Sequence, residues 1–396
     1  MARQRHIGRV LCVLLAVLLS IPVYAVETPA VNAAGAVVMD ADTGEVYYAY
    51  HADEARPAAS MTKLMAVYLA LEEVSAGRLA LDTPVIISER AAAMSNDKRY
   101  SGMEQFREGE GVPVDTLLRL ILCASGNASV VALAEHISGD EAAFVKRMND
   151  RAAAWGVSAR FADCHGFKDE GDAVTPYAMA YLARRVIVDY PETLSYSALK
   201  TVDFHGKTYK TTNLLLRDDR FDGIDGLKTG YTLGAGYCFT ATAARNGRRV
   251  LAVIMGAKNG EARASEAAKF LEYGFARQAE RVEPYTFTGR VSVRRAEFYP
   301  DASVTVACRV TCEQAGAALL LPCGWYLDGE PIAGWQNSAF RMTGGEYRQS
   351  QITRNGERLT AGEHVLEFRV NTAGLQGSEQ YAVRTELLVL SDADAA

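Results

Sequence analysis

The stretch Ala58-Ala59-Ser60-Met61-Thr62-Lys63-Leu64-Met65 places a serine three residues before a lysine at the start of a predicted helix. Residues at positions i and i+3 lie on one face of a helix, with their Cβ atoms about 5–6 Å apart. The spacing therefore predicts that the Lys63 ammonium lies beside the Ser60 hydroxyl. Serine is a weak nucleophile near neutral pH, and a neighbouring amine of lowered pKa can accept its proton.

The S-x-x-K spacing is not specific by itself, because it recurs at Ser95–Lys98 and Ser197–Lys200. Two downstream motifs set the copy at Ser60 apart, Ser125-Gly126-Asn127 and Lys228-Thr229-Gly230. Taken alone, a Ser-Gly-Asn tripeptide between two apolar helical runs is typical of an ordinary turn. The three motifs together instead indicate a single site for acyl transfer.

The predicted elements around these motifs form a mixed α/β (α+β) fold. Apolar residues at helical spacing predict a helix over 60–76, and its buried face would hold Ser60 and Lys63 in place. Asn246-Gly247 is a strong hairpin signal between two predicted strands. Further helices are predicted at 114–123, 128–137, 141–155, 175–189 and 263–276, strands at 36–39, 46–50, 84–88, 237–245 and 249–255, and loops at 161–171 and 209–220.

The length of 396 residues favours two domains. From Val282 onward helical periodicity stops, and alternating runs separated by turn residues predict a β-sandwich with Trp325 in its core. We therefore expect a catalytic domain over 30–280 and a β-sandwich domain over 283–391, the latter a spacer or interaction module. The runs lie at 289–293, 304–310, 324–327, 365–370 and 381–390.

The composition, with 49% hydrophobic and 23% charged residues, is typical of a soluble globular protein. A formal net charge of −6 argues against nucleic acid as the partner, because no basic field would attract phosphate.

Residues 1–25 read as a secretion signal. Arg3, Arg5 and Arg9 precede an apolar run over 10–19, and Val23-Tyr24-Ala25 suits cleavage after Ala25. The apolar run is short for a membrane span, although an uncleaved anchor is the alternative. The sequence thus predicts an exported protein on the cell-wall or periplasmic side of the membrane.

Six of the seven cysteines lie beyond the predicted signal, too few over this length for a disulfide-dependent scaffold. Cys308, Cys312 and Cys323 are close enough in sequence for one local bridge, which the sequence leaves open. There is no C-x-x-C pair and no histidine cluster, so we expect no metal site and no cofactor.

The motifs offer the parts of acyl-transfer chemistry. Ser60 is the candidate nucleophile, and Lys63 is its base if burial and the positive charge of Lys228 lower its pKa. Ser125 can pass a proton to the leaving nitrogen. Asn127 suits a substrate amide, because its side chain both donates and accepts.

The third motif suits the other end of a substrate. Lys228 and Thr229 suit a substrate carboxylate, while Gly230 lets a strand backbone approach the ligand closely.

Residues of about 30–280 resemble D-alanyl-D-alanine carboxypeptidases of the low-molecular-mass penicillin-binding protein type, peptidase family S11. The resemblance rests on the three motifs in their context, residues 56–63, 124–128 and 225–232. It implies a sheet flanked by helices, with an all-helical part carrying S-x-N. It also implies removal of the terminal D-alanine from peptidoglycan stem pentapeptides, and acylation by β-lactams. It further implies an oxyanion hole from the N–H groups of Ser60 and Tyr231, and carboxylate binding by Arg263.

The sequence departs from the family pattern at Ala128, where aspartate is common, and at Tyr231, where histidine is common. Members often end in a cationic amphipathic helix, whereas residues 387–394 here are strand-like and then acidic, so no C-terminal membrane anchor is evident. Two other functions would require a different sequence pattern. A β-lactamase would need a dedicated base such as a loop glutamate, and no matching run is found. A catalytically silent wall-binding protein would have lost Ser60 or Lys63, and both are present.

Overall fold

The computed structural model describes residues 27–280, 287–293, 297–298, 304–312, 318–343, 347–354, 361–375 and 378–389. The predicted signal peptide, residues 1–25, lies outside this range. Among the described residues, no helix combines the length and the hydropathy that crossing a membrane requires.

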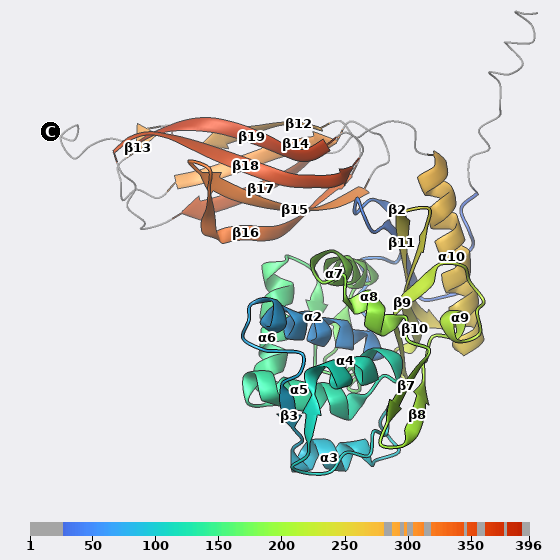
Figure 1. Ribbon diagram of the computed structural model, residues 1–396. Helices are drawn as coiled ribbons and strands as arrows, with labels where there is room; N and C mark the ends of the chain where they lie inside the picture. The colour runs from blue at the N-terminus through green and yellow to red at the C-terminus, as the bar shows by residue number, and fades with distance from the viewer. Residues whose placement is uncertain are drawn as a thin grey trace, which may run out of the picture.

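A five-stranded antiparallel sheet is the platform of the N-terminal part (Figure 1), with the strand order β2-β1-β11-β10-β9. The predicted hairpin at Asn246-Gly247 is confirmed, since it joins β10 to β11 and both residues have positive φ, 52° and 75°. The K-T-G motif lies on β9, at one edge of the sheet. The strands are β1 (Gly35–Asp40), β2 (Val46–Tyr50), β9 (Ile224–Thr232), β10 (Gly236–Arg245) and β11 (Arg248–Ala257).

Both faces of this sheet are covered. Along β1, Ala36 and Val38 pack in the cluster beneath α10 (Gly260–Glu280), while Val37 and Met39 belong to the larger core on the helical side. This alternation follows from the two-residue period of a strand. The helix α10 is longer at both ends than the predicted 263–276, and its Phe270 stacks on Tyr48 with ring centroids 5.1 Å apart.

The opposite face carries the other helices. Every helix that the sequence predicts is present in the structure. Thr175 caps α7 as its sequence predicts, accepting a hydrogen bond from Ala178 N, with Pro176 in the first turn. The helical elements are η1 (Ala59–Thr62), α2 (Lys63–Ser75), α3 (Glu89–Ser95), α4 (Val114–Cys123), α5 (Asn127–Ser138), α6 (Glu141–Ala154), α7 (Pro176–Asp189), α8 (Thr193–Ser197) and α9 (Leu214–Arg217).

The predicted loop over 209–220 is partly wrong. Its first residues belong to a strand pair, and it contains α9, which Asn213 caps by accepting from Leu215 N and Leu216 N. A four-residue helix is too short to show a hydrophobic period. The small strand pairs are β3 (Pro84–Ile86) with β4 (Gly111–Pro113), β5 (Ala159–Arg160) with β6 (Ala173–Val174), and β7 (Thr201–Phe204) with β8 (Lys207–Lys210).

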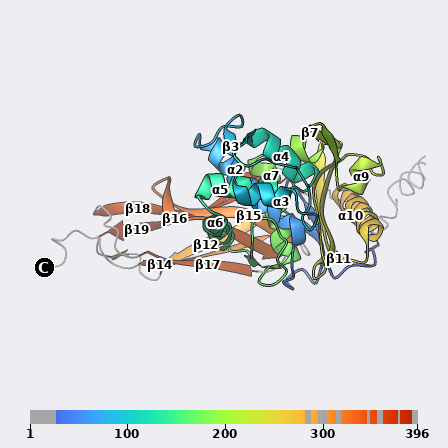
Figure 2. The ribbon, with the colours of Figure 1, turned by 90° about the horizontal axis from the view of Figure 1, so that it is seen from below.

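The C-terminal part is all-β, as predicted, and its two sheets have the orders β12-β14-β17 and β13-β19-β18-β15-β16. Figure 2 shows the two sheets as layers. A Cβ added to Gly289 in β12 would lie 3.0 Å from Val383 in β19, so the layers are in contact. The strands are β12 (Phe287–Val293), β13 (Glu297–Phe298), β14 (Val304–Cys312), β15 (Ala318–Leu327), β16 (Glu330–Thr343), β17 (Tyr347–Arg354), β18 (Gly362–Leu375) and β19 (Ser378–Val389).

The core of this β-rich part contains Trp325, as predicted. Its side chain is fully buried and packs edge-on against Phe368, with ring centroids 5.0 Å apart. Cys308 and Cys323 are buried, while the side chain of Cys312 lies outside the described atoms. The sequence analysis did not predict β13, β16 and β17.

Replacing Phe270 by alanine should lower the free energy of unfolding by about 3–5 kcal/mol, because it removes a buried ring between α10 and the sheet. The measurement is chemical denaturation followed by circular dichroism. Val188→Ala, at a half-exposed position, is the control and should change the midpoint little. A Phe270→Ala midpoint equal to that of the control would contradict the packing described for α10.

Candidate active site

The nucleophile candidate lies at the junction of η1 and α2. Ser60 is in the 3-10 turn η1, and the preceding Ala59 has φ of 50°, an uncommon value for a residue with a side chain. Lys63 is the first residue of α2, and its Nζ donates to Ser60 Oγ at 2.7 Å. The structure thus places the amine beside the hydroxyl.

The Lys63 ammonium donates to a second hydrogen-bond acceptor and is not exposed to solvent. Its Nζ donates to the carbonyl oxygen of His165 at 2.7 Å, and its side chain has no exposed surface. Burial lowers the pKa of Lys63 to about 8, although the charges of Asp163, Cys164 and Glu104 oppose this shift. A lysine with this pKa is partly neutral near neutral pH, which suits the role of a base.

The loop over 161–172 holds the nucleophile turn from one side. The Asp163 carboxylate accepts hydrogen bonds from the backbone N–H groups of residues 165–168 and so folds the loop around itself. A Cβ on Gly166, where φ is 73°, would lie 1.8 Å from the Ala59 carbonyl oxygen, so only glycine fits. Asp172 accepts from Ala58 N at 2.8 Å.

The same loop is tied to the sheet edge. Asp169 accepts a hydrogen bond from the Thr232 hydroxyl and another from Gly234 N at 2.9 Å. The loop therefore bridges from the Ser60 turn to the connection between β9 and β10.

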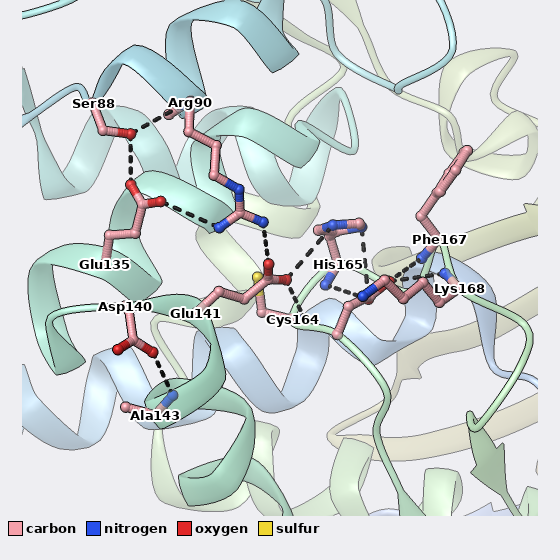
Figure 3. Close-up of polar contacts among 12 residues, drawn as sticks. Ser88, Arg90, Glu135, Asp140, Glu141, Ala143, Cys164, His165, Phe167 and Lys168 are labelled. Carbon is pink, nitrogen blue, oxygen red and sulfur yellow. Dashed lines mark hydrogen bonds and ion pairs between the residues drawn. The ribbon is translucent and has the colours of Figure 1, made fainter.

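The group Glu141, Asp163 and His165 is the one set of side chains in the described part of the chain that brings three potential metal-ligand atoms together. Its carboxylates are already engaged. Arg90 and Cys164 N donate to Glu141 (Figure 3). Four backbone N–H groups donate to Asp163. The His165 ring lies between them, 3.7 Å from Glu141 Oε1 and 3.6 Å from Asp163 Oδ1.

Electrostatics also favour a structural role for this group. Burial lowers the pKa of His165 to about 4, so its ring is neutral near neutral pH. Burial raises the pKa of Glu141, but Arg90 and the Cys164 N–H more than offset this and lower it to about 2. We interpret the three residues as the support that aims the His165 carbonyl at Lys63.

The S-G-N motif forms the turn between α4 and α5. Ser125 is buried and has φ of 63°, and Asn127 is the first residue of α5. Asn127 N donates to Ser101 O at 3.1 Å, while its buried Oδ1 accepts no hydrogen bond from any described residue. Among the hydrogen bonds of the described residues, none joins the Ser125 hydroxyl to Lys63 or Lys228.

Two basic side chains meet at the K-T-G motif, Lys228 on β9 and Arg263 from α10. Lys228 is buried, and its Nζ donates to Thr229 O at 2.8 Å. Burial, then the charges of Lys63 and Arg263, hold the pKa of Lys228 well below its usual range. Arg263 reaches the same strand from α10, donating to Gly230 O at 3.3 Å. Within the described residues neither cation is paired with a carboxylate, which leaves a place for an anion.

Gly230 brings the strand against the nucleophile. A Cβ added to Gly230 would lie 3.0 Å from both Ser60 N and Ala58 O. The next residue, Tyr231, is half exposed and stacks on Tyr237 with ring centroids 4.3 Å apart. These contacts bring the Ser60–Lys63 turn together with the strand that carries Lys228, Thr229, Gly230 and Tyr231, which Arg263 also contacts. Ser125 and Asn127 lie on the α4–α5 turn, beside which Cys123 O accepts a hydrogen bond from Thr212 N.

Several supporting residues were not found in the sequence analysis. Thr212 contacts the K-T-G motif, with its Oγ1 2.6 Å from Thr229 Oγ1. Asp163, which accepts from N–H groups of its own loop, was missed as well. The others are Glu104, Asp169 and Asp172, which accept hydrogen bonds from backbone or hydroxyl groups of other segments. Such residues leave no fixed spacing in the sequence, because their partners are distant along the chain.

Three buried free thiols lie beside the segments that form the site. Cys123 precedes the S-G-N motif, Cys164 precedes His165, and Cys238 pairs with Gly230 across the sheet. Burial raises the pKa of Cys123 and of Cys238 to about 11, and it raises that of Cys164 well above the usual value of a thiol.

Asp172→Asn should change the pH dependence of stability. Burial raises the pKa of Asp172 to about 7 in the folded protein, above the value of 3.8 expected when unfolded. A raised pKa means that stability from this group is complete at low pH and is lost as the pH rises toward 7. As the pH rises from about 4 to 7, the free energy of unfolding of the variant should therefore increase relative to that of the wild type by up to about 1.4 kcal/mol per pH unit.

Urea denaturation across this range measures the difference. Asp82→Asn, at an exposed position, is the control and should run parallel to the wild type. A constant gap between the Asp172→Asn protein and the wild type would refute the raised pKa.

Comparison with known proteins agrees with this geometry. A family model described as D-alanyl-D-alanine carboxypeptidase, Peptidase_S11, matches residues 23–259. The D-alanyl-D-alanine carboxypeptidase DacD of Salmonella typhimurium is 35% identical over 253 residues, which cover 63% of this chain and 65% of DacD. The chain thus spans slightly less than two thirds of the length of this relative.

Solved structures are similar as well. Penicillin-binding protein D2 from Listeria monocytogenes, in its ampicillin-bound form, has a TM-score of 0.54 and 31% identity, covering 63% of this chain and 99% of that one. Penicillin-binding protein 5 from Haemophilus influenzae covers 93% of this chain and 99% of its own with a TM-score of 0.61, and at 23% identity it shows the fold alone. The chain belongs to the D-alanyl-D-alanine carboxypeptidase family, peptidase family S11.

Proposed function

We propose that the protein is a serine-type D-Ala-D-Ala carboxypeptidase, which removes the terminal D-alanine from peptidoglycan stem pentapeptides through an acyl-enzyme on Ser60. The observation that carries the proposal is the buried Lys63, whose Nζ lies 2.7 Å from Ser60 Oγ and whose pKa is lowered to about 8. Family membership and the activity for which its relatives are named support the reaction and the substrate.

The first half of the reaction forms an ester. Lys63 takes the proton of Ser60 Oγ, which attacks the carbonyl carbon of the penultimate D-alanine. The N–H groups of Ser60 and Tyr231 stabilise the oxyanion. The C–N bond then breaks, and the leaving D-alanine nitrogen receives a proton through Ser125. In the second half, water attacks the ester carbonyl, the C–O bond to Ser60 breaks, a proton of that water goes to Ser60 Oγ, and the shortened peptide leaves with a new carboxyl group.

The substrate is held at its two ends. The terminal carboxylate binds where Lys228, Thr229 and Arg263 converge, because these donors lack a carboxylate partner among the described residues. Asn127 Oδ1, buried and without a partner, accepts an N–H of the peptide. This pairing removes the cost of leaving a buried oxygen without a donor.

This function requires export, since peptidoglycan is assembled outside the cytoplasm, and the predicted signal over 1–25 supports it. We further propose that residues 30–280 form the catalytic domain and 283–391 a β-sandwich domain that acts as a spacer or interaction module. Its described residues show no nucleophile beside a base like the Ser60–Lys63 pair.

Benzylpenicillin should acylate Ser60 and remain bound for far longer than one peptide turnover. Its strained amide and carboxylate imitate D-Ala-D-Ala, and its tethered leaving group stays in the site and obstructs water. Intact-mass spectrometry should find one added penicillin on the wild type and none on Ser60→Ala. Ser125→Ala should acylate about 100-fold more slowly, because proton transfer to the leaving nitrogen is lost.

Other outcomes would select another function. Rapid turnover of penicillin without an adduct would favour a β-lactamase. No adduct and no release of D-alanine from a D-Ala-D-Ala peptide would favour a catalytically silent wall-binding protein.

Lys228→Ala should lower kcat/KM on a D-Ala-D-Ala peptide by roughly 10–100-fold, the usual cost of losing a charged hydrogen bond. Amidating the terminal carboxylate of the peptide should then harm the wild type much more than the variant. The readout is D-alanine or D-alaninamide release. If both proteins were equally sensitive to amidation, Lys228 would have no part in binding the carboxylate.

A further inference from the structure

Glu104 is a buried carboxyl group that the reaction above does not use. It lies in the loop between α3 and β4, and its side chain has no exposed surface. Its Oε1 accepts two hydrogen bonds from Ser129 in α5, from the backbone N at 3.1 Å and from the hydroxyl at 2.7 Å. Its Oε2 is buried and has no hydrogen-bond partner among the residues that the structure describes.

The carboxyl is packed against the middle of the S-G-N motif. A Cβ added to Gly126 would lie 2.2 Å from Glu104 Oε1, so the motif accepts only glycine there while Glu104 is in place. A Cβ on Gly102 would lie 2.7 Å from the Gly126 Cα, which shows how closely the two backbones approach. Together with the hydrogen bond from Asn127 N to Ser101 O, these contacts hold the S-G-N motif against the loop that contains Glu104.

The motif needs such support because its backbone is unusual. Ser125 has φ of 63°, in the left-handed region that a residue with a side chain adopts at a cost of about 1–3 kcal/mol. Ser125 and Asn127 flank Gly126, so the position of Gly126 sets where both side chains point. Contacts that hold Gly126 thus hold the proton relay and the amide acceptor.

We propose that Glu104 is a positioning residue for Ser125 and Asn127, and that it acts as a neutral carboxylic acid. This inference rests on the proposed function. Ser129 supplies both donors to Oε1 and none to Oε2, which leaves Oε2 as the oxygen that carries the proton. Glu104 forms no salt bridge among the described residues, and a buried carboxylate without a cation in contact is costly.

The balance of burial and neighbouring groups raises the pKa of Glu104, which is the direction of this form. Burial raises its pKa, while the Ser129 hydrogen bonds and the positive charge of Lys63 in α2 act in the opposite direction. Burial, and then a charge on Glu104, raise the pKa of Tyr209 in β8. Because Gly126 and Ser129 cover it and solvent does not reach it, Glu104 acts through the motif and not on a hydrolytic water.

The test compares Glu104→Gln with Glu104→Ala. Glutamine keeps the Oε1 acceptor and the volume without a charge, and alanine removes both. The readout is the second-order rate constant of acylation by benzylpenicillin, whose side-chain amide suits Asn127, and by 6-aminopenicillanic acid, which lacks that amide. Glu73→Ala is the matched control, since Glu73 is a buried carboxyl paired with Arg78 and Arg147.

We expect the Ala variant to lose about tenfold or more with benzylpenicillin and severalfold less with 6-aminopenicillanic acid. The Gln variant should stay within about threefold of the wild type with both. The losses of Glu104→Ala and Asn127→Ala on benzylpenicillin should be less than additive in the double variant, because both act on one contact. The Glu73→Ala control should lose stability without discriminating between the two compounds.

Three results would overturn the inference: a Gln variant as slow as the Ala variant, equal losses with both compounds, or full additivity with Asn127→Ala. If the Ala variant does not fold, the Gln variant still decides, since a carboxylate requirement would make it slow. A wild type that is not acylated by benzylpenicillin would instead remove the proposed function, so the two failures are distinguishable.

Discussion

The hydrogen bond from Lys63 Nζ to Ser60 Oγ is the interaction on which the N-terminal part depends. It requires a lysine with no exposed surface, and taking an ammonium group out of water is expensive. The molecule supplies two neutral oxygens, Ser60 Oγ and His165 O, and no carboxylate in hydrogen-bond contact. A salt bridge would have stabilised the charged form, whereas these acceptors leave the pKa of Lys63 lowered to about 8.

The use of the His165 carbonyl oxygen as an acceptor for Lys63 explains why the loop over 161–172 is tightly folded. A carbonyl oxygen must be held against Lys63 by something rigid, and the four N–H groups bound by Asp163 make the loop compact. The absence of a Cβ at Gly166 lets the loop touch the Ala59 carbonyl. Gly230 allows the same close approach from the sheet, and Gly126 allows it beside Glu104. Three glycines thus let three segments converge where side chains would have kept them apart.

The sequence predicted the long elements and the pairing of Ser60 with Lys63, because both follow from regular spacing. Helices such as 114–123 and the hairpin at Asn246-Gly247 have their own local signals. The short α9 and the strand pair β7–β8 lack such signals, as do β16 and β17. Glu104, Asp169 and Asp172 escaped for a different reason: their roles come from contacts with residues that are remote in sequence. A buried acid in a loop looks the same in a sequence as an exposed one.

The three buried thiols have a consequence of their own. Cys123, Cys164 and Cys238 adjoin the S-G-N turn, the loop that carries His165 and the strand that carries Gly230, respectively. A buried thiol of raised pKa reacts with an alkylating reagent only while its surroundings are open and the thiolate can form. The rate at which each cysteine is labelled therefore measures how often the segment that contains it separates from its neighbours. The native sequence thus provides one cysteine for each of these three segments, and its labelling rate reports the local opening of that segment.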